Sequence, residues 1–504
     1  MTRRVAWILS WIVVAAAAMF LRLEDLADRP FHADEATGAR ITARRMESGG
    51  ANFDPKHYHG PLLADLTMPL CRARGENGWL EMTKESPRLV SAIAGILLVL
   101  LPLAGVRRFG HAPMLAAAAL LASSPLLVYY SRMFIHEPLL VLFGMAAMFS
   151  LAGGSRLGGA GFLTGLMFAV KETFAISILA WSAAAVLLVL ENRRHVTVDA
   201  VRGAWRAWWR PLLLALSAFL ATWIFFYTDA LRHPRGLVDS VRTFFVYETV
   251  VGHDKPFGYY LKLLAWPEKS AGRWWFGTPV LVLALLAYAG TFRRHGMTDH
   301  TRRCIRFLAY SAAGHFLIYS LIAYKTPWLA CLPWAQVCLL AGFAVCLIPR
   351  KNLPALALAG VVLAGTLFTQ FKQARIASGR LSSDARNPFA YVPTQRNVER
   401  LEEWLGQLHQ SLPAGSLEPA LVIGRDYWPL PWYLRGMEKT GWLAEAPPEA
   451  ATLPLVFAMP GAAATLTDQL AATHTALPRG LRAEVPLMMY LRNDLWELWM
   501  NSDD

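Results

Sequence analysis

The chain has 504 residues, of which 55% are hydrophobic and only 17% are charged. A soluble globular protein carries about 25% charged residues, so the composition excludes an ordinary soluble domain and indicates a membrane protein. The net charge of +13 comes largely from arginines that cluster in short runs between apolar segments. That placement favours membrane topology over nucleic-acid binding as the origin of the charge.

Eleven apolar segments are long enough, or nearly so, to cross the hydrocarbon core as helices. They lie at about 5–23, 88–106, 113–130, 138–153, 159–172, 174–190, 211–228, 277–292, 305–323, 328–348 and 354–370. With the N-terminus in the cytoplasm, every even-numbered segment ends at a basic loop, as the positive-inside rule requires. These loops contain Arg107-Arg108, Arg156, Arg193-Arg194, Arg293-Arg294, Arg302-Arg303 and Arg350-Lys351. We therefore expect a multi-pass protein of the cytoplasmic (inner) membrane.

The odd number of spans places the C-terminal part outside the cytoplasm, in the periplasm of a cell that has one. We divide the chain into a transmembrane domain, 1–370, and an extracytoplasmic domain, 371–504. Apolar residues recur at helical spacing over 395–412, and short apolar runs at 420–424, 454–458 and 486–491 read as strands. Alternating helix and strand predict a small α/β domain.

Under this topology the unusual polar residues gather in the outer loops. An acidic pair, Asp34-Glu35, directly follows the first span, and acids at a membrane rim often mark a working site. Basic residues in the other outer loops suggest cations for a phosphate beside a base for an acceptor. The outer-loop candidates are His57, His59, Arg132, Glu137, Lys171, His253, Lys255, Tyr259 and Lys325.

Each candidate has a plainer interpretation. Asp34-Glu35 could be a solvated pair, Arg132 could snorkel, and Lys171 with Glu172 could form an ordinary ion pair in a loop. His57 and His59 could contribute to a zinc site, but the sequence shows no third ligand. It also shows no cofactor that the protein would require. The aromatic residues could form an interfacial belt.

The centres of the spans carry almost no charge, which argues against a transporter or pump, because those place ionisable residues near the midplane. The pattern fits an enzyme at the outer membrane rim, with the lipid of a lipid-linked substrate in the bilayer and its head group outside.

These residues also form motifs in a recognisable order. Asp34-Glu35 follows the first span, His59-Gly60-Pro61-Leu62 comes next, and Arg132 with Glu137 marks the exit of the third span. Further along the chain come Gly165 with Lys171, the group His253, Pro256, Phe257, Tyr259 and Tyr260, and Lys325-Thr326-Pro327-Trp328 with Pro333. Arg386–Tyr391 and Asp426–Arg435 complete the series beyond the last span.

In this order and placement the sequence resembles the GT-C superfamily of polytopic glycosyltransferases. The likeness is to the protein O-mannosyltransferase and aminoarabinose transferase branch, and most to the flippase-activity-associated membrane proteins. It covers nearly the whole chain, although Gly60 replaces a proline of the family pattern.

The resemblance implies a polyprenyl-phosphate sugar donor and an inverting, mannosyltransferase-like reaction. Asp34 would act as the general base, and Glu35 and Glu137 would orient the site. Arg132, Lys171 and Lys255 would stabilise the leaving phosphate. The sugar and the acceptor (protein, lipid or glycan) stay open. Two other functions also stay open: a non-catalytic accessory that binds lipid-linked glycans during export, and a glycan transporter.

Overall fold

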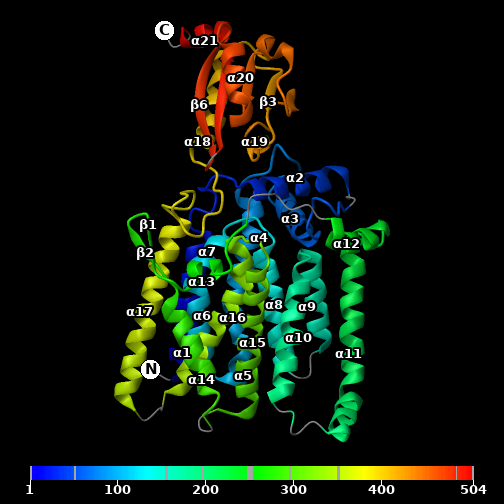
Figure 1. Ribbon diagram of the computed structural model, residues 1–504, viewed down its shortest axis with the longest axis vertical. Coiled ribbons are helices and arrows are strands. Elements are labelled where there is room, and N and C mark those ends of the chain that lie inside the picture. The colour runs from blue at the N-terminus through cyan, green and yellow to red at the C-terminus, as the bar shows by residue number, and fades with distance from the viewer. Residues whose placement is uncertain are drawn as a thin grey trace.

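The computed structural model is a bundle of long helices that carries a separate α/β domain at one end (Figure 1). It describes residues 3–49, 53–153, 157–191, 193, 197–246, 254–293, 297–348, 352–483 and 485–501. The N-terminus lies at the end of the bundle away from the α/β domain, and the C-terminus lies at the far tip of that domain.

Each of the eleven predicted spans corresponds to a helical segment. Within the described residues, seven helices are long and apolar enough to cross a membrane, or eight if one bent pair counts as a single span. Three further apolar helices, α8, α9 and α14, are shorter. The segments are α1 (Arg3–Leu23), α4 (Glu85–Leu100), α6 (His111–Ser123) with α7 (Pro125–Ser131), α8 (Glu137–Ala152), α9 (Leu157–Val170), α10 (Phe174–Glu191), α11 (Val198–Tyr227), α14 (Thr278–Gly290), α15 (Asp299–Leu321), α16 (Cys331–Gly342) and α17 (Leu353–Ser378).

The third predicted span is broken rather than continuous. α6 and α7 meet at an angle of 60° at Ser124. Pro125 disfavours a helical conformation in the residue before it, and Ser124 is extended, with φ −60° and ψ 118°. Arg22 of α1 donates to the carbonyls of Leu121 and Ala122 at 3.1 Å, so the end of α6 does not leave its acceptors unpaired.

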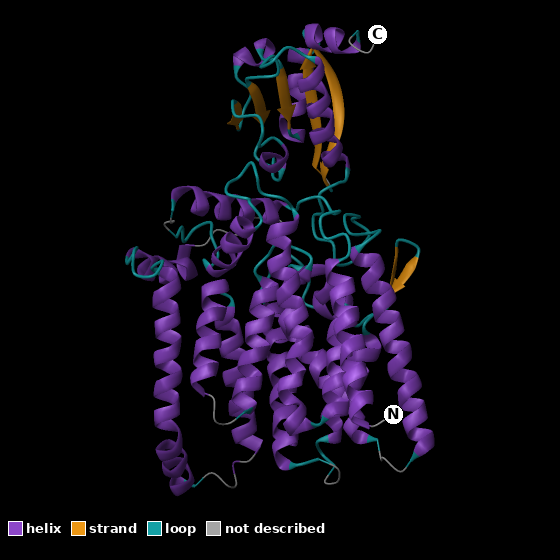
Figure 2. Ribbon diagram, turned by 180° about the vertical axis from the view of Figure 1, so that it is seen from behind, coloured by secondary structure: helices purple, strands orange, loops and turns teal. Residues whose placement is uncertain are grey.

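The outward faces of the helices are apolar, as contact with lipid requires. α1, α11 and α17 expose large aliphatic side chains, among them Val13, Leu214 and Val361, which are 60–70% exposed. Trp205, Trp208 and Trp209 are exposed near the start of α11, where an interfacial belt is expected. The helices run side by side over the full depth of the bundle (Figure 2). The fold is therefore that of a polytopic α-helical membrane protein.

A layer of short elements covers the end of the bundle nearest the α/β domain (Figure 1). It contains α2 (Ala33–Ser48), α3 (Leu62–Ala73), α12 (Arg235–Val246), α13 (Tyr259–Leu264) and the hairpin β1 (Glu268–Ser270) with β2 (Arg273–Trp275). Of the predicted basic loops, Arg156, Arg194, Arg294, Arg350 and Lys351 lie outside the described residues.

The C-terminal domain has a five-stranded mixed sheet in the order β4-β3-β5-β7-β6. β3 pairs in parallel with β4 and β5, aligning Val422 with Phe457, while β7 runs antiparallel to β5 and β6. The elements are α18 (Asn397–Ser411), β3 (Ala420–Ile423), α19 (Leu430–Tyr433), β4 (Thr440–Leu443), β5 (Leu455–Ala458), α20 (Pro460–Leu470), β6 (His474–Arg482), β7 (Val485–Arg492) and α21 (Asn493–Met500).

The sequence predicted the helix at 395–412 and the three inner strands, and these are confirmed. It missed the edge strands β4 and β6. Pro478 and Gly480 lie within β6, where they argue against a strand unless it lies at an edge. The last transmembrane helix, α17, continues to Ser378. The predicted domain boundary at 370 therefore lies within this helix and marks only the end of its apolar stretch.

The C-terminal domain shares a core with α2 and α3. Phe31, Ala36 and Trp79 are buried in one cluster with Val422 and Trp432 of the domain. The rings of Phe31 and Trp432 lie 4.3 Å apart. The domain therefore packs directly on the segment that carries the acidic pair.

Candidate active site

The acidic pair lies in the first turn of α2. His32 is the N-cap: its Nδ1 accepts from the Asp34 backbone N–H, and the Glu35 carboxylate accepts from the His32 backbone N–H at 3.0 Å. This is a reciprocal capping box, in which acids also complement the positive end of the helix dipole. Neighbouring positions on a helix point in different directions, so the two carboxylates meet different surroundings.

Glu35 is fully buried and serves as the central ion of the local structure. Its carboxylate accepts two hydrogen bonds from Arg88 of α4, at 2.7 and 2.9 Å, and one from the Phe134 backbone N–H at 2.9 Å. Arg29 lies 3.6 Å away. Burial acts to raise the pKa of Glu35, but the charges of Arg88 and Arg29 and the hydrogen bonds outweigh it and lower the pKa to about 2. Glu35 therefore holds α2 to α4 and to the loop after α7.

Asp34 is half exposed, with its Oδ2 3.7 Å from Nδ1 of His32. Burial raises the pKa of Tyr324, and the nearby charge of Asp34 raises it further. Burial likewise raises the pKa of Tyr391, and Asp34 adds to that effect. On the C-terminal domain, burial lowers the pKa of Arg482 and the charge of Asp34 opposes that lowering. The charge of an accessible carboxylate thus acts on two phenols and a guanidinium that come from three distant parts of the chain.

The linker between α17 and α18 holds this arrangement in place. The ring of His32 bonds through Nε2 to the carbonyl of Tyr391 at 3.0 Å. The hydroxyl of Thr394 donates to the carbonyl of Phe31 at 2.9 Å, and the backbone N–H of Phe31 donates to the hydroxyl of Tyr433. The turn before Asp34 is therefore fixed by residues about 360 to 400 positions away.

A second group of ions lies in the neighbouring loops. Nζ of Lys171 is 2.7 Å from Oε1 of Glu137, and both side chains are buried. His59 Nδ1 is 3.0 Å from Oε2 of Glu172. Burial raises the pKa of Tyr324, the charge of Lys171 opposes that rise, and the charge of Glu137 adds to it, so this group lies near the same phenol as Asp34. The structure brings together candidates that the sequence placed in separate loops.

The side chains of two predicted cations already donate hydrogen bonds to backbone carbonyls. Arg132 donates to the carbonyls of Leu21 and Asp25 at 3.1 Å, at the end of α1. Lys325 is buried and donates to the carbonyl of Lys255 at 2.9 Å. These contacts give both side chains a role in holding loops, whatever else they bind.

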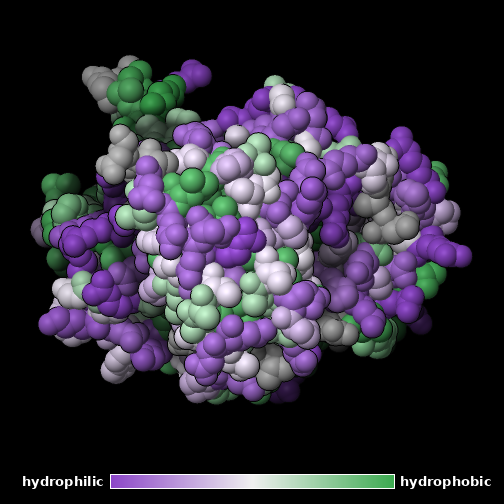
Figure 3. All heavy atoms as spheres, turned by 90° about the horizontal axis from the view of Figure 1, so that it is seen from above, coloured by the Kyte–Doolittle hydropathy of each residue, from purple (hydrophilic) through white to green (hydrophobic). Residues whose placement is uncertain are grey.

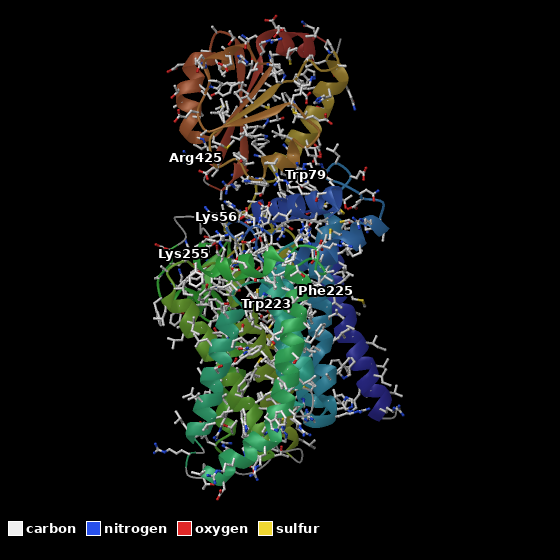
Figure 4. All side chains as sticks on the ribbon, turned by 90° about the vertical axis from the view of Figure 1, so that its right-hand side faces the viewer. Lys56, Trp79, Trp223, Phe225, Lys255 and Arg425 are labelled. Carbon is white, nitrogen blue, oxygen red and sulfur yellow. The ribbon has the colours of Figure 1, made fainter. Side chains whose placement is uncertain are left out.

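The remaining candidates lie further out. The side chain of Lys255 is exposed at the end of the bundle nearest the C-terminal domain (Figure 4). Tyr259, at the start of α13, is half buried. His57 is 60% exposed and pairs with Asp54 at 2.9 Å. His253 lies outside the described residues. In the part of the chain that the structure describes, no three His, Cys, Asp or Glu side chains are grouped as metal ligands would be.

Sequence reasoning missed several residues of the site: Arg29, His32, Arg88, Tyr324, Tyr391 and Arg482. For Arg88 a signal existed, because an arginine at the start of an apolar span is costly unless it is paired. Tyr391 ends the motif at Arg386–Tyr391, but only the fold places it and the remaining residues near Asp34.

No protein-family model matches the chain, and no curated protein matches it in sequence. Solved structures do match its fold. ArnT from Cupriavidus metallidurans in the apo state is similar with a TM-score of 0.64 at 14% identity, over 97% of this chain and 98% of ArnT. ArnT bound to undecaprenyl phosphate matches with a TM-score of 0.61 at 14% identity, over 95% and 98%. The archaeal oligosaccharyltransferase AglB from Archaeoglobus fulgidus, in complex with an inhibitory peptide and a dolichol-phosphate, matches with a TM-score of 0.54 at 14% identity, over 91% of this chain and 70% of AglB.

The chain therefore has the GT-C fold, as its motifs indicated. The match to ArnT spans nearly the whole of both chains, so it includes the C-terminal α/β domain as well as the helices.

Proposed function

We propose that the protein is a membrane glycosyltransferase that moves a sugar from a polyprenyl-phosphate donor to an acceptor hydroxyl at the outer face of the cytoplasmic membrane. One observation carries the proposal: on a GT-C fold, Asp34 is an accessible carboxylate at the end of the bundle nearest the C-terminal domain, and the buried Glu35–Arg88 pair holds its helix in place. The ArnT structure with undecaprenyl phosphate and the AglB structure with dolichol-phosphate support a lipid-phosphate donor.

In the proposed reaction Asp34 takes the proton of the acceptor hydroxyl. The acceptor oxygen forms a bond to the anomeric carbon on the face opposite the phosphate, and the bond from that carbon to the phosphate oxygen breaks. Polyprenyl phosphate leaves, and the configuration at the anomeric carbon inverts. Negative charge develops on the leaving phosphate, where fixed cations stabilise it.

Lys255 and Lys171 are our candidates for that phosphate. Lys255 is exposed, whereas Lys171 would have to share its ammonium with Glu137. Arg132 also lies at the rim, but its guanidinium already bonds two carbonyls. Glu35, with no exposed surface, acts in this proposal by positioning Asp34.

Transfer of a labelled sugar from polyprenyl phosphate by purified protein in nanodiscs tests the proposal. Asn has the shape of Asp but cannot accept a proton, so Asp34→Asn should preserve folding and donor binding. Loss of a general base lowers the rate by about 10²–10⁴-fold. A normal rate in Asp34→Asn would refute the role of Asp34 as base. Absence of transfer in both wild type and variant, with retained binding of the lipid-linked sugar, would favour the accessory function.

A further inference from the structure

A cleft of about 710 Å³ lies between α2 and the C-terminal domain, beyond the Asp34 site. Arg40 and Arg44 of α2 form one wall, with Tyr58 beside them. Tyr427, Trp428 and Trp442 of the C-terminal domain form the other wall. Viewed from the C-terminal domain, this end of the molecule presents a mostly hydrophilic surface (Figure 3). The four half-buried aromatic rings of the cleft are therefore an unusual feature of it.

The cleft is continuous with the proposed site along one helix. Thr37 also lines it, and Thr37 lies one turn after Asp34 on the same face of α2. The lining extends to Glu47, thirteen residues after Asp34, which is about 20 Å at 1.5 Å per residue. A chain-like ligand lying along α2 would thus reach from the cleft to the Asp34 carboxylate.

The three aromatic rings on the C-terminal domain's side of the cleft pack against one another. The ring of Tyr427 lies 4.8 Å from that of Trp442 and 6.2 Å from that of Trp428. Trp79, at the base of the cleft, packs 5.3 Å from Trp432 and is covered by Arg40. Because little side-chain freedom remains to be lost, binding on these rings costs little conformational entropy.

The chemistry of the lining selects the class of ligand. The negative faces of aromatic rings attract the polarised C–H groups on the flat side of a sugar ring. Arg44 supplies donors for hydroxyl groups, and Glu47 and Glu438 supply acceptors. Charges of both signs line the cleft. A strongly anionic chain would be repelled by the glutamates and a strongly cationic chain by the arginines. An uncharged, hydroxyl-rich chain would be repelled by neither.

We propose that this cleft binds the acceptor and that the acceptor is a neutral oligosaccharide or polysaccharide, laid along α2 with its reacting hydroxyl at Asp34. This inference rests on the proposed function. It narrows the acceptor from protein, lipid or glycan to a glycan that occupies several subsites.

The test measures saccharide binding first and the kinetics of sugar transfer second. Neutral hexose oligomers of different linkage, from dimers to hexamers, are titrated into the full-length protein while tryptophan fluorescence is recorded. We expect at least one linkage to bind, with hexamers tighter than dimers. The Tyr427→Ala/Trp442→Ala double variant should bind about ten- to hundred-fold more weakly, because two ring contacts to the saccharide are lost. Trp499→Ala, an aromatic change in α21 at the far end of the same domain, is the matched control and should bind normally.

A second variant, Arg44→Gln, separates a loss of binding from a folding defect, because Arg44 is exposed and its replacement should not disturb the fold. It should weaken binding while leaving the melting temperature unchanged. In the transfer assay, with the tightest hexamer as acceptor, the double variant should raise the acceptor KM and leave undecaprenyl-phosphate binding unchanged.

The outcomes separate the two proposals. Wild-type transfer with an unaltered acceptor KM in the double variant would overturn the cleft assignment alone. Saccharide binding in the cleft without any transfer would overturn the proposed function and leave the cleft as a saccharide-binding site only. Failure of every hexose oligomer to bind, or transfer to a peptide that the double variant leaves unaffected, would refute the glycan acceptor.

Discussion

The buried Glu35 allows a sharp test of how the site is built. In Glu35→Gln an amide replaces a carboxylate that accepts four hydrogen bonds from Arg88, His32 and Phe134. An amide NH₂ has no acceptor to offer, and the Arg88 guanidinium is left buried without its counter-charge. Breaking a buried ion pair in this way costs about 3–5 kcal/mol.

The pKa of Glu35 gives a second estimate of the same size. The pKa falls from 4.5 to about 2 on folding. Each unit is worth about 1.4 kcal/mol, so the ionised form stabilises the fold by about 3 kcal/mol. Because the folded pKa is the lower one, this stability is complete above about pH 4.5 and is lost as the pH falls toward about 2.

The assay is thermal unfolding of detergent-purified protein, followed by tryptophan fluorescence between pH 4 and 7. We expect Glu35→Gln to lower the melting temperature by several degrees at pH 7 and to lose part of that difference at pH 4. Asp34→Asn, one residue away but half exposed, is the control and should melt as wild type does. In the double variant Glu35→Gln/Arg88→Gln the two losses should not add, because both break the same pair.

Two results would contradict this reasoning. A melting temperature within error of wild type would mean that Glu35 does not hold α2. Normal stability with abolished transfer would mean that Glu35 takes part in the chemistry itself.

Three further predictions concern two groups of ions and the orientation of the chain in the membrane. Arg132→Ala should lower the melting temperature through its lost contacts to the end of α1, whereas Lys255→Ala should raise the donor KM without changing stability; the reverse pattern would exchange their roles. Lys171→Met should destabilise the protein more than Lys171→Met/Glu137→Met, because the double change leaves no buried charge unpaired, and equal melting curves for the two variants would count against the pair. A reporter that is active only in the cytoplasm, fused after Asp504, should be silent, and a strong signal would overturn the expected orientation.

Hydropathy sufficed for the helices because a span must be apolar over its whole length, whatever lies beside it. It could not place the break at Ser124, which depends on Pro125 and on Arg22 from another helix. In the C-terminal domain the inner strands could be predicted because they are continuous apolar runs, such as 455–458. The edge strand β6 could not be predicted, because it contains Pro478, which argues against a strand except at the edge of a sheet.

The sequence by itself determined which residues are candidates, since charge at a membrane rim is costly and therefore informative. It named Asp34, Glu35, Lys171 and Glu137, but it could not say that the last two form a buried pair. Only the tertiary structure decided that Asp34 is accessible while Glu35 is buried, because adjacent helical positions face different neighbours. Only it brought Arg482 near Asp34 and closed an aromatic cleft over α2, because these contacts join segments hundreds of residues apart and leave no local pattern to read.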